Sequence, residues 1–534
     1  MFINNHTKIY SMSFEYEIDS YILNERETIN EINLLITPSI KDFLNIEKDT
    51  KYFIIAPKGF GKTLFLKYKR IKYEEKYRSE SGSCSVFLIP ENKLIDERTI
   101  YLDYDWEQER FLSNEDTWRD VWLLAILLSV IKNIQQDSKR KHNEDYILIM
   151  NGINEANLPR LMKLIKSNSI TPYNFLEKVL NSGHNKFFVL KNELNSLLSI
   201  IRGKRISTAI FLEEIDIKFT NKEKTPDKNT FQNILKLSQI GLMSAVRDLS
   251  NINQHIKVFS CISSESYMQM RQTNEFSLQM GSNIQSINYS KNELKEIINK
   301  KIKSLNKETF VRPKLLHKNP IFCFLGLDKL SDNYVDGGEE KVFDYIYRHT
   351  IKRPVDLILL IDELKNLDIR NEENVKKVIN EKATEIVLGY IKDTMPYLTI
   401  NQEDLERLFT LLNKNIISFD EIQMICSEFN NKTLSTERDC TKSSKIPIFV
   451  ELYNMGLLGI LENYETGEFN CQSFLQPGEL FGVLSTKHVP QSPMYFIHPA
   501  LYREIKRFNS KFEVNKEVIV GDKSPYKITN RDED

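Results

Sequence analysis

The chain has 534 residues, of which 41% are hydrophobic and 28% are charged. This composition is typical of folded globular proteins and excludes a largely disordered chain. The 73 basic and 74 acidic residues leave a net charge of −1, so the sequence as a whole has no excess of positive charge that would attract nucleic acid. A chain of this length is expected to form about two or three domains.

The cysteines and the apolar stretches indicate the cellular setting. The 6 cysteines are scattered and form no Cys-x-x-Cys pair, which predicts reduced thiols rather than a zinc site or a disulfide framework. The first residues lack the basic and then apolar layout of a signal peptide. The most apolar stretch, residues 121–131, is well short of a membrane span and predicts a buried helix. Together these features predict a cytoplasmic protein without membrane contacts.

Short apolar segments rich in β-branched or aromatic residues predict buried parallel strands. They comprise residues 51–56, 99–105, 207–216, 255–263 and 283–290. Segments with the spacing of amphipathic helices separate them. Strands that alternate with helices predict an α/β fold in which helices cover both faces of a parallel sheet.

The remaining patterns suggest how the chain is divided. Helical spacing fills the long interval between the second and third predicted strands, which indicates an insertion that is a candidate site for partners. Near the end of the chain, helices lead to strands in an order that suggests a winged helix. The predicted parts are an N-terminal extension (1–40), an α/β core (41–290) with a helical insertion (about 106–204), a purely helical domain (291–395), a winged-helix-like domain (396–510) and a disordered tail (511–534).

The first predicted strand leads into the loop Ala56-Pro-Lys-Gly-Phe-Gly-Lys-Thr63 and then into a helical pattern. A plain strand-to-helix turn would explain the glycines, but this spacing also fits the Walker A pattern with alanine in the first position. Its glycines let backbone N–H groups surround phosphates, Lys62 would reach the β and γ phosphates, and the Thr63 hydroxyl would bind Mg²⁺. The predicted nucleotide contacts are Ala56, Pro57, Lys58, Gly59, Phe60, Gly61, Lys62, Thr63 and Leu64.

The third predicted strand ends in Glu213-Glu214-Ile215-Asp216. Several carboxylates at the end of a buried strand are costly unless they have a role. This pattern indicates a Walker B strand, in which Glu213 lies near Mg²⁺ and Glu214 polarises the attacking water. In an alternative register, Glu214 is the residue near Mg²⁺ and Asp216 is the general base that activates the water.

The fourth predicted strand ends in serines, and a polar residue there would contact the γ-phosphate. Ser263 is the predicted contact, with Ser260 and Ser264 as alternatives. A guanine-specific protein would carry an Asn-Lys-x-Asp motif, but residues 221–224 read NKEK and lack the aspartate. ATP is therefore expected rather than GTP.

These motifs resemble those of the P-loop ATPases of the additional-strand, catalytic-glutamate (ASCE) division, and most closely the AAA-like and STAND-type bacterial ATPases. The resemblance covers roughly residues 40 to 390. It implies a sheet order of 5-1-4-3-2 and a helical lid over the nucleotide, and it makes residues 291–395 that lid. It also implies that an arginine of the lid touches the γ-phosphate, with Arg353 as the candidate and Arg348 as the competing choice. Arg247 is a candidate arginine finger.

The resemblance implies an ATP-binding and ATP-hydrolysing molecular switch that needs Mg²⁺ and controls a partner or effector protein. Such ATPases often lie in mobile-element or anti-phage defence loci, and some form homo-oligomers. A DNA-associated motor or loader is an alternative, but the presumed recognition helix within residues 443–456 has one lysine and no arginine. A second alternative is a scaffold that binds ATP without hydrolysing it.

Overall fold

A computed structural model describes residues 25–78, 86–89, 99–136, 142–220, 225–264, 267, 281–313, 319–331, 339–395, 398, 400–434, 448–463, 470–474, 489, 492 and 494–514. The chain divides into two compact units, one formed by Asp19–Ile287 and the other by Met1–Ile18 with Asn288–Asp534. The NKEK segment, most of the N-terminal extension and most of the predicted tail lie outside the described residues.

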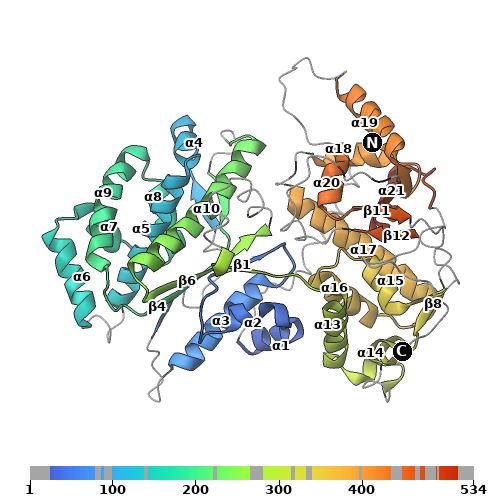
Figure 1. Ribbon diagram of the computed structural model, residues 1–534, viewed down its shortest axis with the longest axis horizontal. Helices are drawn as coiled ribbons and strands as arrows, with labels where there is room; N and C mark the ends of the chain where they lie inside the picture. The colour runs from blue at the N-terminus through green and yellow to red at the C-terminus, as the bar shows by residue number, and fades with distance from the viewer. Residues whose placement is uncertain are drawn as a thin grey trace, which may run out of the picture. The chain divides into compact units, whose positions relative to one another are not determined.

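The unit Asp19–Ile287 contains a five-stranded parallel sheet (Figure 1). Its strands are β1 (Phe53–Ala56), β2 (Phe87–Ile89), β4 (Thr208–Leu212), β6 (Ile256–Ser263) and β7 (Ile284–Ser286). Their spatial order is β2-β4-β6-β1-β7, and each pair of neighbours is parallel. Numbered along the chain among themselves and read from β7, these strands lie in the order 5-1-4-3-2. Strand β6 therefore lies between β1 and β4.

The segment 99–105 was predicted as a strand of this sheet, and that prediction is wrong. Its strand β3 (Thr99–Leu102) pairs instead with β5 (Asp216–Phe219) in a separate parallel ribbon. Ile100 and Leu102 are buried, whereas Tyr101 between them is 48% exposed. This alternation is typical of a strand with one face in solvent, not of one buried on both faces. The edge position next to β4 is held by β2, which is too short to be recognised from its apolar pattern.

Helices cover both faces of the five-stranded sheet, as predicted for an α/β fold. On one side lie α1 (Glu25–Leu35), α2 (Lys41–Leu44) and α3 (Lys62–Tyr77), with α10 (Lys228–Ile252) on the other (Figure 1). A short 3-10 turn, η1 (Pro38–Ile40), precedes α2, and η3 (Gly281–Asn283) precedes β7. Both α3 and α10 pack against β6, whose side chains are buried almost throughout.

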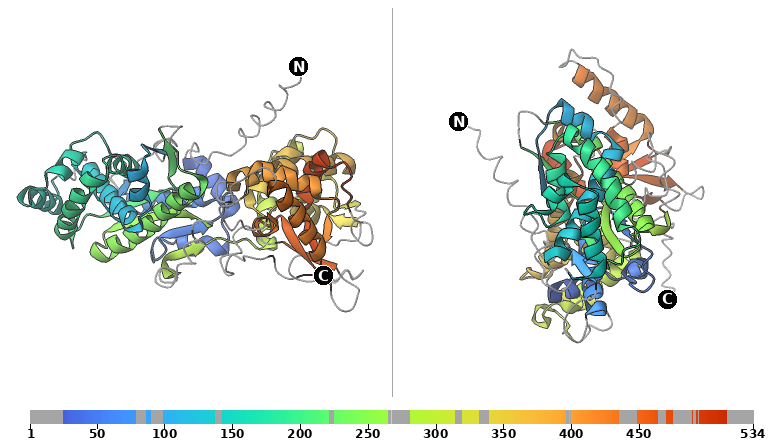
Figure 2. Two further views of the ribbon diagram at one scale, coloured as in Figure 1. Left: turned by 90° about the horizontal axis from the view of Figure 1, so that it is seen from above. Right: turned by 90° about the vertical axis from the view of Figure 1, so that its left-hand side faces the viewer.

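The predicted insertion between β3 and β4 is helical, and Figure 2 shows its helices grouped at one end of this unit. They are α4 (Trp106–Leu112), α5 (Glu115–Gln136), α6 (Glu144–Glu155), α7 (Pro159–Ile165), α8 (Pro172–Leu180) and α9 (His184–Ile201). Helix α5 is buried and crosses α10 at Gly241, where an added Cβ would lie 2.4 Å from the Cβ of Trp118. Among the described residues, no helix is both long and apolar enough to cross a membrane.

The second unit begins with a mainly helical region. Its helices are α13 (Lys291–Ser304), α14 (Pro320–Leu325), α15 (Val342–Arg348), α16 (Pro354–Lys365) and α17 (Glu372–Thr394), with the short turn η4 (Lys307–Thr309). An antiparallel strand pair, β8 (Lys329–Ser331) with β9 (Glu339–Lys341), interrupts them. The sequence predicts a purely helical region over 291–395, and that prediction is wrong because this strand pair lies within it.

The rest of the second unit combines helices with an antiparallel sheet. Its elements are α18 (Gln402–Leu411), β10 (Ile416–Ser418), α19 (Phe419–Leu434), α20 (Ile448–Asn454), β11 (Leu458–Asn463), β12 (Asn470–Ser473), β13 (Met494–Ile497), η8 (Pro499–Leu501) and α21 (Tyr502–Phe508). The strand order is β10-β13-β11-β12. Helix α20 belongs to the presumed recognition helix, and its residues from Ile448 to Tyr453 are buried. This part of the helix packs in the protein core and cannot enter a DNA groove.

Candidate nucleotide site

The loop between β1 and α3 has the backbone conformation that its glycines permit. Gly59 and Gly61 have φ of +89° and +87°, a region that other residues rarely adopt. Gly61 is also the N-cap of α3 and has no side chain to satisfy the first N–H groups of the helix. These N–H groups and the positive end of the helix dipole form an environment that favours an anion.

Lys62 and Thr63, the first residues of α3, lie next to the acidic end of β4. The Lys62 ammonium donates a hydrogen bond to the carbonyl of Ala56 at 2.8 Å. It also forms an ion pair with Glu214, with 3.4 Å between Nζ and Oε1. The Thr63 hydroxyl donates to Oε2 of Glu213 at 3.2 Å. The structure thus brings together four of the predicted site residues from segments about 150 positions apart in the chain.

The carboxylate of Glu214 is held by charge rather than by hydrogen bonds. Its Oε1 atom is buried and has no hydrogen-bond partner, because the Lys62 ammonium at 3.4 Å provides an ionic contact only. The side chains of Lys62 and Glu214 are 11% and 25% exposed, so solvent reaches both. The buried Oε1 atom is an acceptor that a ligand or a water molecule admitted to the site would satisfy, and accepting a proton from water is the task of a catalytic carboxylate.

The other predicted loop residues differ in exposure. Ala56, Pro57, Phe60 and Leu64 are buried, whereas Lys58 is exposed. The buried side chains anchor the loop to the sheet and to the neighbouring helices. Their backbone groups, rather than their side chains, would be the parts that contact phosphates.

Of the three candidate serines, Ser263 lies beside the loop. It is the register partner of Ala56, whereas Ser260 pairs with Phe53, three residues before the loop begins. Ser263 is buried, and its backbone N–H donates to the side-chain oxygen of Gln239 at 3.2 Å. Ser264 is buried as well.

The alternative acidic residue, Asp216, takes part in a different structure. It is the first residue of β5, is half exposed and accepts a hydrogen bond from the Thr99 hydroxyl at 3.4 Å. Its carboxylate also lies 3.6 Å from the ammonium of Lys218. The contacts with Lys62 and Thr63 belong to Glu214 and Glu213.

Sequence reasoning missed two neighbours of the acidic pair. The Tyr173 hydroxyl, from α8 of the helical insertion, accepts from the backbone N–H of Glu213 at 2.7 Å and donates to its carbonyl at 3.2 Å. The Cys261 thiol on β6 is fully buried; burial first, and then the charge of Glu213, raises the pKa of this thiol well above its usual value. No local pattern signals either residue, because each is brought to the site by tertiary packing.

The candidate lid arginines already have carboxylate partners within the second unit. Arg353 forms an ion pair with the fully buried Asp356 at 2.7 Å, and its guanidinium lies over the ring of Tyr390. Burial raises the pKa of Asp356, while the nearby Arg353 opposes that shift. Arg348 pairs with Glu340 at 2.9 Å. These contacts give both arginines structural roles, and a role at the γ-phosphate stays a prediction.

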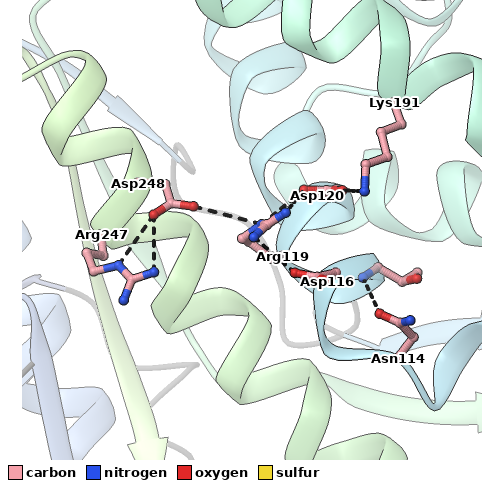
Figure 3. A network of polar contacts seen from close by, with 8 residues as sticks. Asn114, Asp116, Arg119, Asp120, Lys191, Arg247 and Asp248 are labelled. Atoms are coloured by element: carbon pink, nitrogen blue, oxygen red, sulfur yellow. Dashed lines mark hydrogen bonds and ion pairs between the residues drawn. The ribbon is translucent and has the colours of Figure 1, made fainter. Parts of the chain in front are cut away.

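Arg247, the candidate arginine finger, belongs to a polar network between α5, α9 and α10 (Figure 3). It pairs with Asp248 at 3.3 Å, and Asp248 lies 3.8 Å from Arg119. Arg119 also forms an ion pair with Asp120. The Asp120 carboxylate forms a second ion pair with the ammonium of Lys191, on α9, at 2.7 Å. The network ties the helical insertion to α10, and a finger role for Arg247 stays a prediction.

The same residues meet the chemical requirements of a magnesium nucleotide. The Thr63 hydroxyl and the Glu213 carboxylate are hard oxygen ligands of the kind that Mg²⁺ prefers, and they already lie within 3.2 Å of each other. Comparisons of the chain with protein-family models, with curated proteins and with solved structures each returned no match. The function must therefore be argued from the geometry of this site.

Proposed function

We propose that this chain binds ATP with Mg²⁺ and hydrolyses it, and that it acts as a molecular switch. The observation that carries the proposal is the meeting of Lys62 and Thr63 with Glu214 and Glu213 at the carboxyl end of the parallel sheet. Ligands of open α/β sheets bind at that end of the strands. The order of the five strands, with β6 between β1 and β4, supports the proposal because the ASCE resemblance implies it.

Each residue would have a distinct task. The loop N–H groups and Lys62 would hold the phosphates, while Thr63 and Glu213 would hold Mg²⁺, which supplies positive charge to the transferring phosphoryl group. Glu214 would accept a proton from the water that attacks the γ-phosphorus. A bond forms from that water oxygen to phosphorus as the bond to the bridging oxygen of ADP breaks, which yields ADP and phosphate.

The release of phosphate would change the contacts at the end of β4, and Tyr173 connects that end to the helical insertion. A change at the site could thus reach a partner protein through these helices. Control of an effector protein, in a cytoplasmic defence system or elsewhere, belongs to this proposal and rests on the resemblance. The burial of α20 weighs against the DNA-motor alternative.

The test is ATP turnover by the purified full-length chain with Lys62→Ala, Glu214→Gln, Asp216→Asn and Lys72→Ala. We expect Lys62→Ala to lose ATP binding, and Glu214→Gln to keep binding but lose about 100-fold or more in kcat. Asp216→Asn tests the alternative register and should retain activity. Lys72→Ala is the matched control, because Lys72 lies on α3 and, among the carboxylates of the described residues, pairs with the exposed Glu75 alone.

Three outcomes would redirect the proposal. Loss of activity in Asp216→Asn rather than in Glu214→Gln would favour the alternative register. Stimulation of turnover by DNA would favour the motor. Binding without turnover, together with a loss of stability in Lys62→Ala, would favour the scaffold.

A further inference from the structure

The second unit contains a cavity of about 550 Å³. Its walls come mainly from the end of α15, one side of α17, and the segment formed by η8 and α21, with Ser331 of β8 and Val514 completing the lining. The volume is within the range of sites that hold small organic ligands, roughly 300–1,000 Å³. This cavity lies entirely within residues 331–514 and includes none of the residues of the β1–α3 loop.

Positive charge dominates the lining. The cationic side chains are Arg348, Lys376, Lys377, Arg503 and Lys506, whereas Glu381 is the acidic one. Three of the cations have carboxylate partners: Arg348 pairs with Glu340, Lys376 with Glu372, and Arg503 with Glu381. Lys377 and Lys506 have no such partner among the described residues and are exposed. Two positive charges therefore remain for a bound anion.

One wall of the cavity consists of two tilted rings and a guanidinium group, all of them largely buried. The rings of Tyr345 and His349 have centroids 4.3 Å apart, and the Arg348 guanidinium lies 4.6 Å from the centre of the Tyr345 ring. Asn380 fixes this wall through a hydrogen bond from its amide nitrogen to the Tyr345 hydroxyl at 3.1 Å. Aromatic and guanidinium planes of this kind are surfaces on which a planar heterocycle can stack.

His349 adds a hydrogen-bond acceptor to that wall. Its Nδ1 atom lies 2.7 Å from the carbonyl of Tyr345, and a carbonyl can only accept, so Nδ1 carries the proton. Burial, followed by the charge of Arg348, lowers the pKa of His349 well below its usual value. The ring is therefore neutral at pH 7, and Nε2 can accept a hydrogen bond from the amino or imino group of a base.

We propose that this cavity is a binding site for a small phosphate-bearing heterocycle of nucleoside monophosphate size. Lys377 and Lys506 would bind the phosphate, and the wall of Tyr345, His349 and Arg348 would hold the base. The site shares no residue with the β1–α3 loop; of its lining, only Arg348 is also a candidate for the predicted γ-phosphate contact. A ligand there would join α17 to α21 and could regulate the second unit.

The experiment is calorimetric titration of the full-length Lys62→Ala variant, in which binding at the β1–α3 loop is disabled. The probes are AMP, GMP, CMP and UMP, with inorganic phosphate and a single-stranded oligonucleotide as comparisons. We expect at least one of the monophosphates to bind. Adding Lys377→Ala and Lys506→Ala should weaken that binding at least about tenfold, because charge-assisted hydrogen bonds are lost.

Two further variants make the test specific. The matched control adds Lys303→Ala and Lys307→Ala, which remove two exposed lysines of the same unit outside the cavity and should leave binding unchanged. His349→Phe, with folding checked by thermal melting, should weaken monophosphate binding but not binding of inorganic phosphate. Three results would overturn the proposal: no binding of any monophosphate, equal binding without Lys377 and Lys506, or binding of the oligonucleotide alone. None of these depends on whether the chain hydrolyses ATP.

Discussion

Two of the lysine–carboxylate pairs on helix α3 differ sharply in their surroundings. At its start, Lys62 and Glu214 are 3.4 Å apart, and their side chains are 11% and 25% exposed. Seven residues later, Lys69 and Asp49 are 2.8 Å apart, with 0% and 3% exposed. The same pair of charges is accessible to solvent at the start of the helix (the open pair) and sealed from solvent near its middle (the sealed pair).

The sealed pair is stabilised by several further groups. Lys69 donates to the carbonyl of Phe43 at 2.6 Å and lies over the rings of Phe43 and Phe259. Asp49 also accepts hydrogen bonds from Lys257 at 2.7 Å and from the Tyr73 hydroxyl. Burial lowers the pKa of Lys69, and the charge of Asp49 opposes this shift. The comparison teaches that a fully buried ion pair fixes structure, whereas a longer and solvent-accessible one can exchange partners with a ligand.

Removal of the sealed lysine should have the largest effect. Lys69→Met leaves Asp49 buried with Lys257 as its remaining cation, and we expect the free energy of unfolding to fall by about 3–5 kcal/mol. Trp106, Trp118 and Trp122 all lie in the unit Asp19–Ile287, so tryptophan fluorescence in urea reports the unfolding of this unit alone.

The control is Lys72→Met on the same helix, where Lys72 is 38% exposed and pairs with Glu75. It should change stability by less than about 0.5 kcal/mol. A loss below about 1 kcal/mol in Lys69→Met would contradict the structural role, because it would mean that an apolar side chain can replace the lysine.

The contrast between the two pairs also shows what the sequence could reveal. The spacing of Gly59, Gly61 and Lys62 is local, and so the β1–α3 loop could be predicted from it. Glu213 and Glu214 could be proposed as its partners because their segment ends a recognisable strand. The Lys69–Asp49–Lys257 cluster could not be predicted, because Asp49 and Lys257 are 208 positions apart and no motif relates them.

One of the five strand predictions failed for a related reason. Residues 99–105 have the apolar pattern of a strand. Whether such a strand joins the central sheet depends on whether other elements bury both of its faces, which the local pattern does not reveal. Tyr101 is exposed, and the segment pairs with β5 instead. Tyr173 was missed because it reaches Glu213 from a helix 40 positions away. Local patterns thus predicted the loop and its acidic partners, whereas tertiary packing determined their other neighbours.

A smaller effect is expected at the link between the open pair and the helical insertion. Tyr173→Phe removes the hydroxyl that bonds both backbone groups of Glu213, while the ring can keep its edge contact with Trp122. We expect a loss of about 1 kcal/mol in the free energy of unfolding, the usual contribution of a hydrogen bond. If the hydroxyl positions Glu213, kcat for ATP should fall as well.

Tyr146→Phe on α6 is the matched control, because it removes a tyrosine hydroxyl from the same helical insertion, whereas the hydroxyl that bonds Glu213 is that of Tyr173. It should leave kcat unchanged. If Tyr173→Phe lowers stability but not kcat, then the hydroxyl supports the fold and does not position the carboxylate. An unchanged stability would show that water replaces the hydroxyl without cost.

The smallest effect should come from the coupling between Lys62 and Glu214 themselves. A double-mutant cycle with Lys62→Met and Glu214→Gln, followed by tryptophan fluorescence in urea without nucleotide, isolates their interaction from their separate contacts. Because the two groups are 3.4 Å apart and solvent reaches both, we expect a coupling of less than about 1 kcal/mol. A coupling above about 2 kcal/mol would mean that Lys62 and Glu214 stabilise the fold as the Lys69–Asp49 pair does. That result would favour a structural role for the loop. A weak coupling means that Lys62 can leave Glu214 at little cost when a phosphate arrives, as a switch that rebinds ATP requires.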